Sequence, residues 1–260
     1  MAERPIRFDD GAGYERMMGV WSKIAGNVFL DWLSPPPGLS WIDIGCGNGA
    51  FTELLVERCA PSEVHGVDPS PAQLAFARTR PAARVATFHD GDAMALPFPN
   101  ARFDAATMAL SIFFFPDAAK GVAEAVRVAK PGGMVAAYAW NMLEGGFPLH
   151  LVHEEMRALG ISPPLPPSAQ ASRVDILREL WRDAGLRGVE TRSIAVTREF
   201  SGFDEYWSTA LLSGSMKVLA ASAPTDIERL KERVRARLSA NADGTITCAA
   251  SANAIRGRLP

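Results

Sequence analysis

Three carboxylates and a glycine-rich turn stand where a small molecule could be bound. Asp43, Asp68 and Asp92 each follow a short, mostly apolar run, and Asp43 leads into the turn Gly45-Cys46-Gly47-Asn48-Gly49. The carboxyl ends of parallel strands share one edge of a sheet, where open α/β folds bind ligands. Glycines allow close backbone approach, and a helix that starts there presents unpaired N–H groups. A single acid is often only a turn residue, but three acids with this turn predict a nucleotide-type pocket.

The residue before the turn distinguishes between two ligands. The turn can be forced into the G-x-G-x-x-G/A pattern of dinucleotide-binding proteins, but it fits better as acid-x-G-x-G-x-G, with Gly49 tightening the turn. A carboxylate at Asp43 would repel a pyrophosphate, whereas it suits a cationic ammonium and sulfonium. S-adenosylmethionine (SAM) is therefore favoured over NAD. Asp68 could take both ribose hydroxyls, while Asp92 and the Ala93 N–H could meet the edge of the adenine.

The elements that must position these residues alternate along the chain. Apolar runs predict strands over 39–44, 63–67, 84–89 and 134–140, with a further strand starting at Phe103. Helical spacing predicts helices over 14–33 and 50–60, one from Pro71, and one between Asp117 and the 131–133 turn. This alternation predicts a parallel sheet covered on both faces. Farther along we expect a helix and a loop over 141–172 and strands over 188–197 and 245–250. Helices are expected over 174–184 and 203–221, and a last helix follows a capping box at 225–228.

Composition sets the broad class. With 260 residues and 48% hydrophobic content, the chain can form one domain over 1–260. A net charge of -2 indicates no nucleic-acid partner, and the basic run at 229–237 is interleaved with acids, as on a solvated helix face. Three scattered cysteines match no zinc spacing, which predicts no metal site and reduced thiols in a cytoplasmic protein. Nothing resembles a signal core or a membrane span, so we expect a monomer or homodimer without membrane insertion.

These motifs together resemble the class I SAM-dependent methyltransferases, and most closely the bacterial group similar to quinone-biosynthesis C-methyltransferases. The resemblance rests on residues 43–49, 66–70 and 91–98, and it continues through 103–104 and 130–133. It covers the chain from about Tyr14 to Trp140. It implies a Rossmann-like, seven-stranded, mostly parallel sheet with helices on both faces, an antiparallel last strand and a helical lid.

The resemblance also implies roles for individual residues. Asp43 and Gly45 would hold the methionine end of SAM, Gly47 and Gly49 would allow close approach, and Asp68 would bind the ribose. The product of the reaction would be S-adenosylhomocysteine. The implied cofactor-binding set is Tyr14, Trp21, Asp43, Gly45, Cys46, Gly47, Gly49, Asp68, Pro69, Asp92, Ala93, Met94 and Ala109.

The acceptor side is less sharply indicated. Residues 14–33, 141–172 and 203–221 are expected to cover the pocket. The run 112–115 is apolar where relatives often carry polar or histidine residues, which departs from a quinone-type pattern, and no residue is required as a general base. Candidates to line an acceptor pocket are Phe113, Phe114, Trp140, Phe147 and His150, although core packing or a solvated helix face would explain them too.

Three kinds of function compete for these residues. The favoured one is methyl transfer from SAM to a small, partly apolar acceptor by in-line displacement. The glycine and acid motifs report binding and not turnover, so a SAM-binding protein without transferase activity is the alternative. A nicotinamide-dependent oxidoreductase is less favoured, because it would not need the two C-terminal strands.

Overall fold

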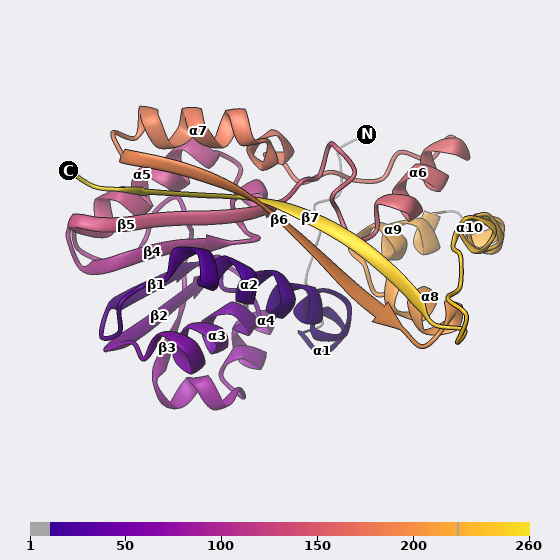
Figure 1. The fold of residues 1–260 in the computed structure, drawn as a ribbon, viewed down its shortest axis with the longest axis horizontal. Helices are drawn as coiled ribbons and strands as arrows, with labels where there is room; N and C mark the ends of the chain where they lie inside the picture. The colour runs from indigo at the N-terminus through magenta and orange to yellow at the C-terminus, as the bar shows by residue number, and fades with distance from the viewer. Residues whose placement is uncertain (1–10, 223) are drawn as a thin grey trace.

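The chain is built around one seven-stranded sheet (Figure 1), seen in a computed structural model that describes residues 11–222 and 224–260. The strand order is β3-β2-β1-β4-β5-β7-β6; the neighbours from β3 to β5 are parallel, and β7 runs antiparallel to β5 and β6. The expected fold class is confirmed, including the antiparallel last strand. The strands are β1 (Ser40–Ile44), β2 (Glu63–Asp68), β3 (Ala86–Asp90), β4 (Phe103–Ala109), β5 (Ala129–Trp140), β6 (Arg187–Phe200) and β7 (Ile246–Arg258).

Helices cover both faces of this sheet. One face carries α2 (Val20–Leu33), α3 (Ala50–Cys59) and α4 (Pro71–Ala77), and the other carries α5 (Ala118–Val128) and α7 (Val174–Asp183). Further helices, α6 (His150–Ala158), α8 (Phe203–Ala210), α9 (Gly214–Ser222) and α10 (Pro224–Arg237), gather at one end of the sheet (Figure 1). The short helical segments are α1 (Gly11–Tyr14), η1 (Glu15–Gly19), η2 (Pro81–Arg84), η3 (Ile112–Phe114) and η4 (Ala169–Ser172). No helix within the described ranges is long and apolar enough to cross a bilayer.

The core lies between the sheet and its helices. Every residue of β1 is buried, as expected for a central parallel strand covered on both faces. Large side chains complete the packing, with Trp41 and Tyr138 on the sheet and Phe29 on α2 all fully buried. Two helix starts carry the caps that the sequence indicates, because the Ser70 and Asp117 side chains accept hydrogen bonds from the backbone N–H of the third residue after each.

Several boundaries differ from the prediction. The single helix expected over 203–221 is two helices, α8 and α9, separated by a turn at 211–213. Helix α10 begins at Pro224, so Thr225 lies inside it instead of capping it. The strand expected over 245–250 is only the outer half of β7, whose inner half, from Ala252 to Arg258, pairs with β5. That inner half reads ANAIRGR and has weak strand propensity, so pairing within the sheet decides its structure.

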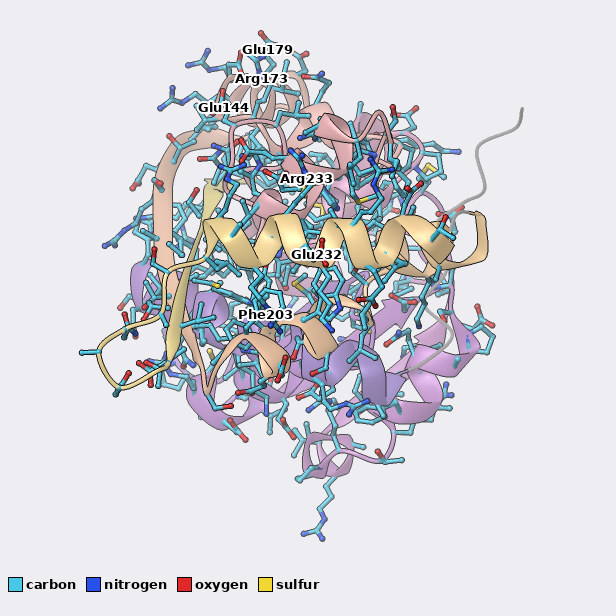
Figure 2. All side chains as sticks on the ribbon, turned by 90° about the vertical axis from the view of Figure 1, so that its right-hand side faces the viewer. Glu144, Arg173, Glu179, Phe203, Glu232 and Arg233 are labelled. Atoms are coloured by element: carbon cyan, nitrogen blue, oxygen red, sulfur yellow. The ribbon has the colours of Figure 1, made fainter. Side chains whose placement is uncertain are left out.

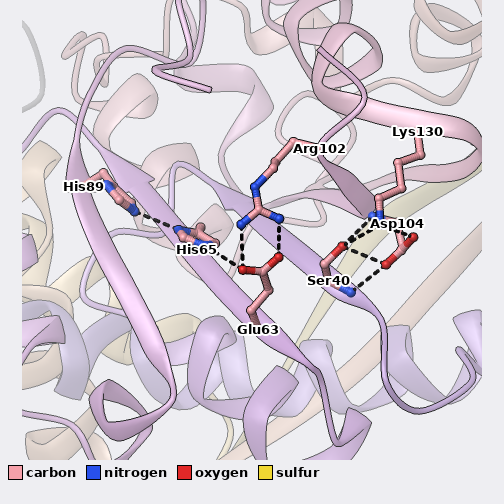
Figure 3. Close-up of polar contacts among 7 residues, drawn as sticks. All are labelled: Ser40, Glu63, His65, His89, Arg102, Asp104 and Lys130. Atoms are coloured by element: carbon pink, nitrogen blue, oxygen red, sulfur yellow. Dashed lines mark hydrogen bonds and ion pairs between the residues drawn. The ribbon is translucent and has the colours of Figure 1, made fainter. Parts of the chain in front are cut away.

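Polar side chains join the strands mainly at their amino ends (Figure 3), opposite the edge where the glycine turn lies. Arg102 donates two hydrogen bonds to the Glu63 carboxylate, and Lys130 Nζ lies 2.8 Å from Asp104 Oδ1. Asp104 Oδ2 also accepts from the Ser40 hydroxyl at 2.7 Å. Burial alone would raise the pKa of Asp104, but the bonds from Lys130 and Ser40 outweigh it and lower that pKa to about 2. These contacts tie strand starts together and leave the carboxyl edge free for a ligand.

The basic run of α10 is paired with acids of neighbouring helices. Figure 2 shows α10 crossing one end of the molecule with Glu232 and Arg233 on it. Arg233 Nε lies 2.6 Å from Glu155 Oε2, and Arg237 Nη1 lies 2.8 Å from Glu155 Oε1. Two residues of the basic run, Arg233 and Arg237, therefore attach α10 to α6.

Candidate functional site

A pocket of about 790 Å³ opens at the carboxyl edge of the sheet, where β1, β2 and β4 end. Its size falls within the range typical of small-molecule sites. Among the residues predicted from the sequence, its walls contain Gly45, Cys46, Gly47, Asp68, Pro69, Asp92, Ala93, Ala109 and Phe114. Except for Asp43, the residues expected at three strand ends thus meet around one cavity, because the strands are parallel.

The glycine turn has a backbone that other residues rarely adopt. Gly45, Gly47 and Gly49 have φ of 72°, 53° and 78°. The N–H groups of Gly45 and Cys46 both donate to the Val67 carbonyl, at 2.7 and 3.0 Å, which fixes the turn against β2. A Cβ on Gly45 would lie 2.5 Å from the Cβ of Ser111, whereas one on Gly47 would meet nothing within 4 Å. Gly45 therefore serves packing, and Gly47 leaves open space for a ligand.

Asp68 is held in place by the same turn. Its Oδ2 accepts from the Gly47 N–H and its Oδ1 from the Ser70 N–H, each at 2.9 Å. Burial raises the pKa of Asp68, although both of these bonds oppose the rise. Each carboxylate oxygen keeps a lone pair for a ligand hydroxyl. The side chain is thus an oriented acceptor on the pocket wall.

Asp43 is placed differently from the other acids, since it does not line the pocket. It is fully buried between β1 and α3, and its Oδ2 accepts from the Thr52 hydroxyl at 2.6 Å. Its Oδ1 has no hydrogen-bond partner among the described residues. Burial is the main cause that raises its pKa, to about 7. The charge of Asp68 adds to the rise, whereas the hydrogen bond from Thr52 opposes it. A cation bound beside the turn would stabilise the ionised form.

The third acid lies at an exposed turn after β3. Asp92 Oδ1 accepts from the Met94 N–H at 2.8 Å, so this carboxylate shapes its own turn. Ala93 lines the pocket beside it, while Met94 does not. Ala109, at the end of β4, also lines the pocket, next to Leu110, whose φ is 57° and whose N–H donates to Tyr138 O.

A small apolar chamber of about 60 Å³ adjoins this pocket, and the two share Leu110, Phe114 and Pro164 as lining residues. Segments from all three expected covers meet at the chamber. The remaining lining residues are Met17, Met18, Phe113, Trp140, Met142, Phe147, His153, Pro166, Ser213, Gly214 and Ser215. The predicted acceptor residues Phe113, Phe114, Trp140 and Phe147 therefore gather in one place.

Some predicted residues lie elsewhere. His150 lines neither cavity, and its Nε2 is 3.1 Å from Glu154 Oε1 at the surface. Trp21 is 2% exposed and packs edge-to-face on Trp140 at 6.2 Å between ring centroids, lining neither cavity. Gly49 caps α3 behind the turn. The side chain of Tyr14 lies outside the described residues.

The structure also places residues in the cavity walls that are not in the predicted set of binding residues. His153 lines the chamber, one helical turn after His150. The sequence does contain a sign that His153 is buried. Val152 and Met156 stand at helical spacing and mark the buried face of α6, and His153 lies on that face. Further residues lining the pocket are Ser22, Ser111, Tyr138, Pro164, Leu165 and Pro167.

A metal has no evident place in this site. Within residues 11–222 and 224–260, no cluster of three or more His, Cys, Asp or Glu side chains could hold an ion. Cys46, which lines the pocket, is kept as a neutral thiol, because burial and the nearby Asp43 and Asp68 raise its pKa well above the ordinary value.

Comparisons with known proteins agree with this geometry. Residues 42–137 match the methyltransferase domain family. Over 93 residues the chain is 42% identical to a chloroplastic 2-methyl-6-phytyl-1,4-hydroquinone methyltransferase of Oryza sativa subsp. japonica, covering 36% of this chain and 27% of that protein. Over 94 residues it is 42% identical to the demethylmenaquinone methyltransferase of Thermus thermophilus, covering 35% of this chain and 43% of that protein. The chain thus spans less than half the length of these relatives.

The fold has solved counterparts as well. A phosphoethanolamine N-methyltransferase of Haemonchus contortus, solved with S-adenosylhomocysteine, superposes with a TM-score of 0.59 at 19% identity, covering 95% of this chain and 56% of that one. This likeness concerns the fold. The match of residues 42–137 to the methyltransferase domain family supports SAM as the cofactor, and the open space at Gly47 and the orphan oxygen of Asp43 fit it. The matched domain over residues 42–137, the sheet and the pocket together support a class I SAM-dependent methyltransferase that resembles the quinone-biosynthesis enzymes over that stretch.

Proposed function

We propose that this protein transfers the methyl group of SAM to a small, partly apolar organic acceptor by in-line displacement. The observation that carries the proposal is the junction of two cavities. The large pocket has the polar walls that a charged cofactor needs, and the apolar chamber lies beside it, with Leu110, Phe114 and Pro164 lining both. A protein that only senses SAM would have no use for the second space.

Different residues at the pocket would bind different parts of the cofactor. Asp68 would accept hydrogen bonds from the ribose hydroxyls, since its oxygens are already oriented by Gly47 and Ser70. The buried Asp43 would supply negative charge near the cationic end of SAM, with the Ala109 region beside it. Asp92 and Ala93 would read the edge of the adenine.

Catalysis here would consist mainly of alignment. SAM supplies a methyl group that is already activated on a sulfonium, and its transfer leaves S-adenosylhomocysteine. Holding the acceptor in line can contribute about 7–11 kcal/mol of the barrier. Pro164, Leu165 and Pro167 from the 141–172 segment lie on the pocket wall and would keep water out. We infer that residues 1–260 act as one unit, with 14–33, 141–172 and 203–221 as its cover.

The relatives suggest a chemical class for the acceptor. The two named above act, by their names, on a hydroquinone and on demethylmenaquinone. An aromatic ring suits a chamber lined by Phe113, Trp140 and Phe147. The departure at residues 112–115 leads us to propose a smaller acceptor than a prenylated quinone.

The role of Asp68 can be tested by cofactor binding. Replacing Asp68 with Ala removes two charge-assisted hydrogen bonds to the ribose, so we expect SAM to bind at least about tenfold more weakly, as measured by calorimetric titration. Asp183→Ala is the control, because Asp183 is an exposed acid at the end of α7, outside the pocket, and its loss should leave the affinity unchanged. Equal affinities for the wild type and Asp68→Ala would refute the ribose assignment.

Turnover needs a separate measurement. Incubation with SAM and fractionated small-molecule extracts should yield S-adenosylhomocysteine and a methylated product in the same fraction. Tight SAM binding with no product from any fraction would favour the alternative, a SAM-binding protein without transferase activity.

A further inference from the structure

A proline-rich segment between α6 and η4 contributes to the wall of the large pocket. We call residues 161–168 the proline strap, which forms neither helix nor strand over 161–166. A proline ring fixes φ at about −65°, and the residue before a proline is restricted to extended conformations. The run Pro163-Pro164-Leu165-Pro166-Pro167 therefore has little conformational freedom. The strap is stiff although it lacks regular secondary structure.

Hydrogen bonds fasten the strap at both ends. At its start, the Ile161 N–H donates to the Met156 carbonyl of α6 at 2.9 Å. At its end, the Ser168 N–H donates to the Phe113 carbonyl at 3.0 Å, and the Ser168 hydroxyl donates to the Phe115 carbonyl at 2.7 Å. Phe113 and Phe115 follow β4 in the chain, so Ser168 ties the strap to the segment after that strand.

Leu165 differs from its neighbours in the strap. Pro163 and Pro166 are buried, whereas Leu165 is 43% exposed and lines the large pocket. Among the large apolar side chains that are exposed in the described part of the chain, Leu165 alone lines either cavity. Covering such a side chain with an apolar ligand is favourable, because it removes apolar surface from water. The position of Leu165 therefore points to a ligand with apolar surface.

The strap lies on the apolar side of the pocket. Asp68 and Asp92 stand at the ends of β2 and β3, whereas Ser168 ties the strap to the segment after β4, on the other side of β1. A sulfonium or a ribose gains little from an apolar wall, while an apolar acceptor group does. The lining residues that 114–116 and the strap supply are Phe114, Phe115, Pro116, Pro164, Leu165 and Pro167.

We infer that Leu165 determines specificity by covering an apolar face of the acceptor, and that Ser168 positions it through the strap, an inference that rests on the proposed methyl transfer. The acceptor class so selected carries an uncharged ring or chain that reaches the strap while its reacting atom faces the cofactor. Because the strap is stiff before the acceptor arrives, little conformational entropy is lost when the two meet. A flexible loop in the same place would bind the same surface more weakly.

The test uses alcohols that share one polar group and differ in apolar area. 1-Butanol, cyclohexanol and 2-naphthol are titrated into the protein saturated with S-adenosylhomocysteine, and ligand-observed NMR gives the affinities. In the wild type we expect the affinity to rise along this series. In Leu165→Ala we expect 2-naphthol to bind about 3- to 10-fold more weakly, because part of the leucine side chain no longer covers it. Calorimetric titration should show an unchanged affinity for S-adenosylhomocysteine.

Another exposed leucine provides the matched control. Leu143 is 37% exposed and lines neither cavity, so Leu143→Ala should bind 2-naphthol like the wild type. Leu165→Met keeps an apolar side chain of similar volume and should stay within about twofold of the wild type.

The role of Ser168 has its own variants. Ser168→Ala removes the hydroxyl bond that ties the strap to Phe115, so we expect 2-naphthol to bind about 2- to 5-fold more weakly. Ser168→Thr keeps a hydroxyl and should restore the affinity. Ser162→Ala changes an exposed serine at the other end of the strap and should have no effect. Equal affinities for the wild type and Ser168→Ala would refute the positioning role.

The outcomes separate the two proposals. Absence of S-adenosylhomocysteine binding to the wild type would overturn the proposed function, and with it the acceptor role of Leu165. Normal binding of S-adenosylhomocysteine would leave the proposed function standing, and the acceptor contact alone would fall in either of two cases. In the first, none of the alcohols binds the wild type, or 2-naphthol binds the wild type and Leu165→Ala equally. In the second, Leu165→Ala loses as much affinity for S-adenosylhomocysteine as for 2-naphthol, because Leu165 would then cover the cofactor.

Discussion

At the scale of single residues, the unusual group is Asp43. A fully buried carboxyl with one orphan oxygen is costly to ionise, and Thr52 offers its only hydrogen bond among the described residues. Such a site is destabilising on its own and becomes favourable when a cation arrives. The arrangement fits a cofactor whose positive charge completes the site.

This burial makes stability depend on pH. The pKa of Asp43 is about 7 in the folded protein, above its ordinary value of 3.8. The stability that the protonated carboxyl contributes is therefore fully present below pH 3.8 and is lost as the pH rises through 7. Between pH 5 and 7 we expect a loss of about 2 kcal/mol in the free energy of unfolding from this group, absent in Asp43→Asn. Urea denaturation at both pH values measures it. Thr52→Val should steepen the loss, and an identical slope in the wild type and Asp43→Asn would contradict the assignment.

At the scale of elements, the N-terminal segment is fastened to the glycine turn. Glu15, in η1, accepts from Asn48 Nδ2 at 2.8 Å and pairs with Arg80. Arg80 in turn donates to the Asn48 carbonyl at 2.6 Å and to Glu53 at 2.9 Å. Arg80 is buried, so these contacts are less screened than surface ion pairs. The network connects the expected cover to the turn that would hold SAM.

Cutting this connection should change how fast the cofactor leaves. In Glu15→Ala we expect S-adenosylhomocysteine to dissociate about 3- to 10-fold faster, since one charge-assisted hydrogen bond to the turn is lost. Stopped-flow displacement gives the rate. Arg16→Ala, which changes the exposed neighbour of Glu15, is the control and should dissociate like the wild type. Equal rates for all three proteins would show that the network does not govern release.

At the scale of the whole molecule, the large pocket and the small apolar chamber depend on different parts of the fold. The parallel strands bring the glycine turn and the acids together, whereas the chamber needs the N-terminal segment, the 141–172 segment and the turn before α9. On the face away from α2, Trp181 of α7 is fully buried and donates its indole N–H to the Val135 carbonyl at 3.0 Å. It attaches α7 to the sheet without touching either cavity.

Stability and binding should therefore separate at this position. Trp181→Ala should cost about 3–5 kcal/mol of unfolding free energy, as large core truncations do, while the molecules that remain folded keep their SAM affinity. Glu179→Ala, an exposed change on the same helix (Figure 2), should stay within about 0.5 kcal/mol. Urea denaturation and calorimetry on the same samples measure both quantities. A Trp181→Ala protein that folds stably but fails to bind SAM would contradict the separation.

Local patterns predicted many of the residues that gather at the carboxyl edge of the sheet, and their roles toward a cofactor stay predictions. The Asp43–Gly49 turn, Asp68 and the Asp92–Ala93 pair each stand at or just after the end of a strand in the sequence. A parallel sheet places such strand ends on one edge. The acceptor side was predicted less well. The sequence pointed to His150, but the buried face of α6 carries His153, and Trp21 packs behind Trp140 instead of facing a cavity. Which side of a helix faces inward depends on what packs against it.

The sequence by itself determined the fold class, the cofactor and the residues at three strand ends, because short-range spacing specifies strands, glycine turns and helix starts. Only the tertiary structure decided how far β7 extends, where the helix over 203–221 breaks, and which polar groups meet around the small chamber. Those features arise from contacts between segments far apart in the chain, such as His153 with Ser215 and Ala252 with Trp140. No local pattern encodes them, since each depends on the packing of its distant partner.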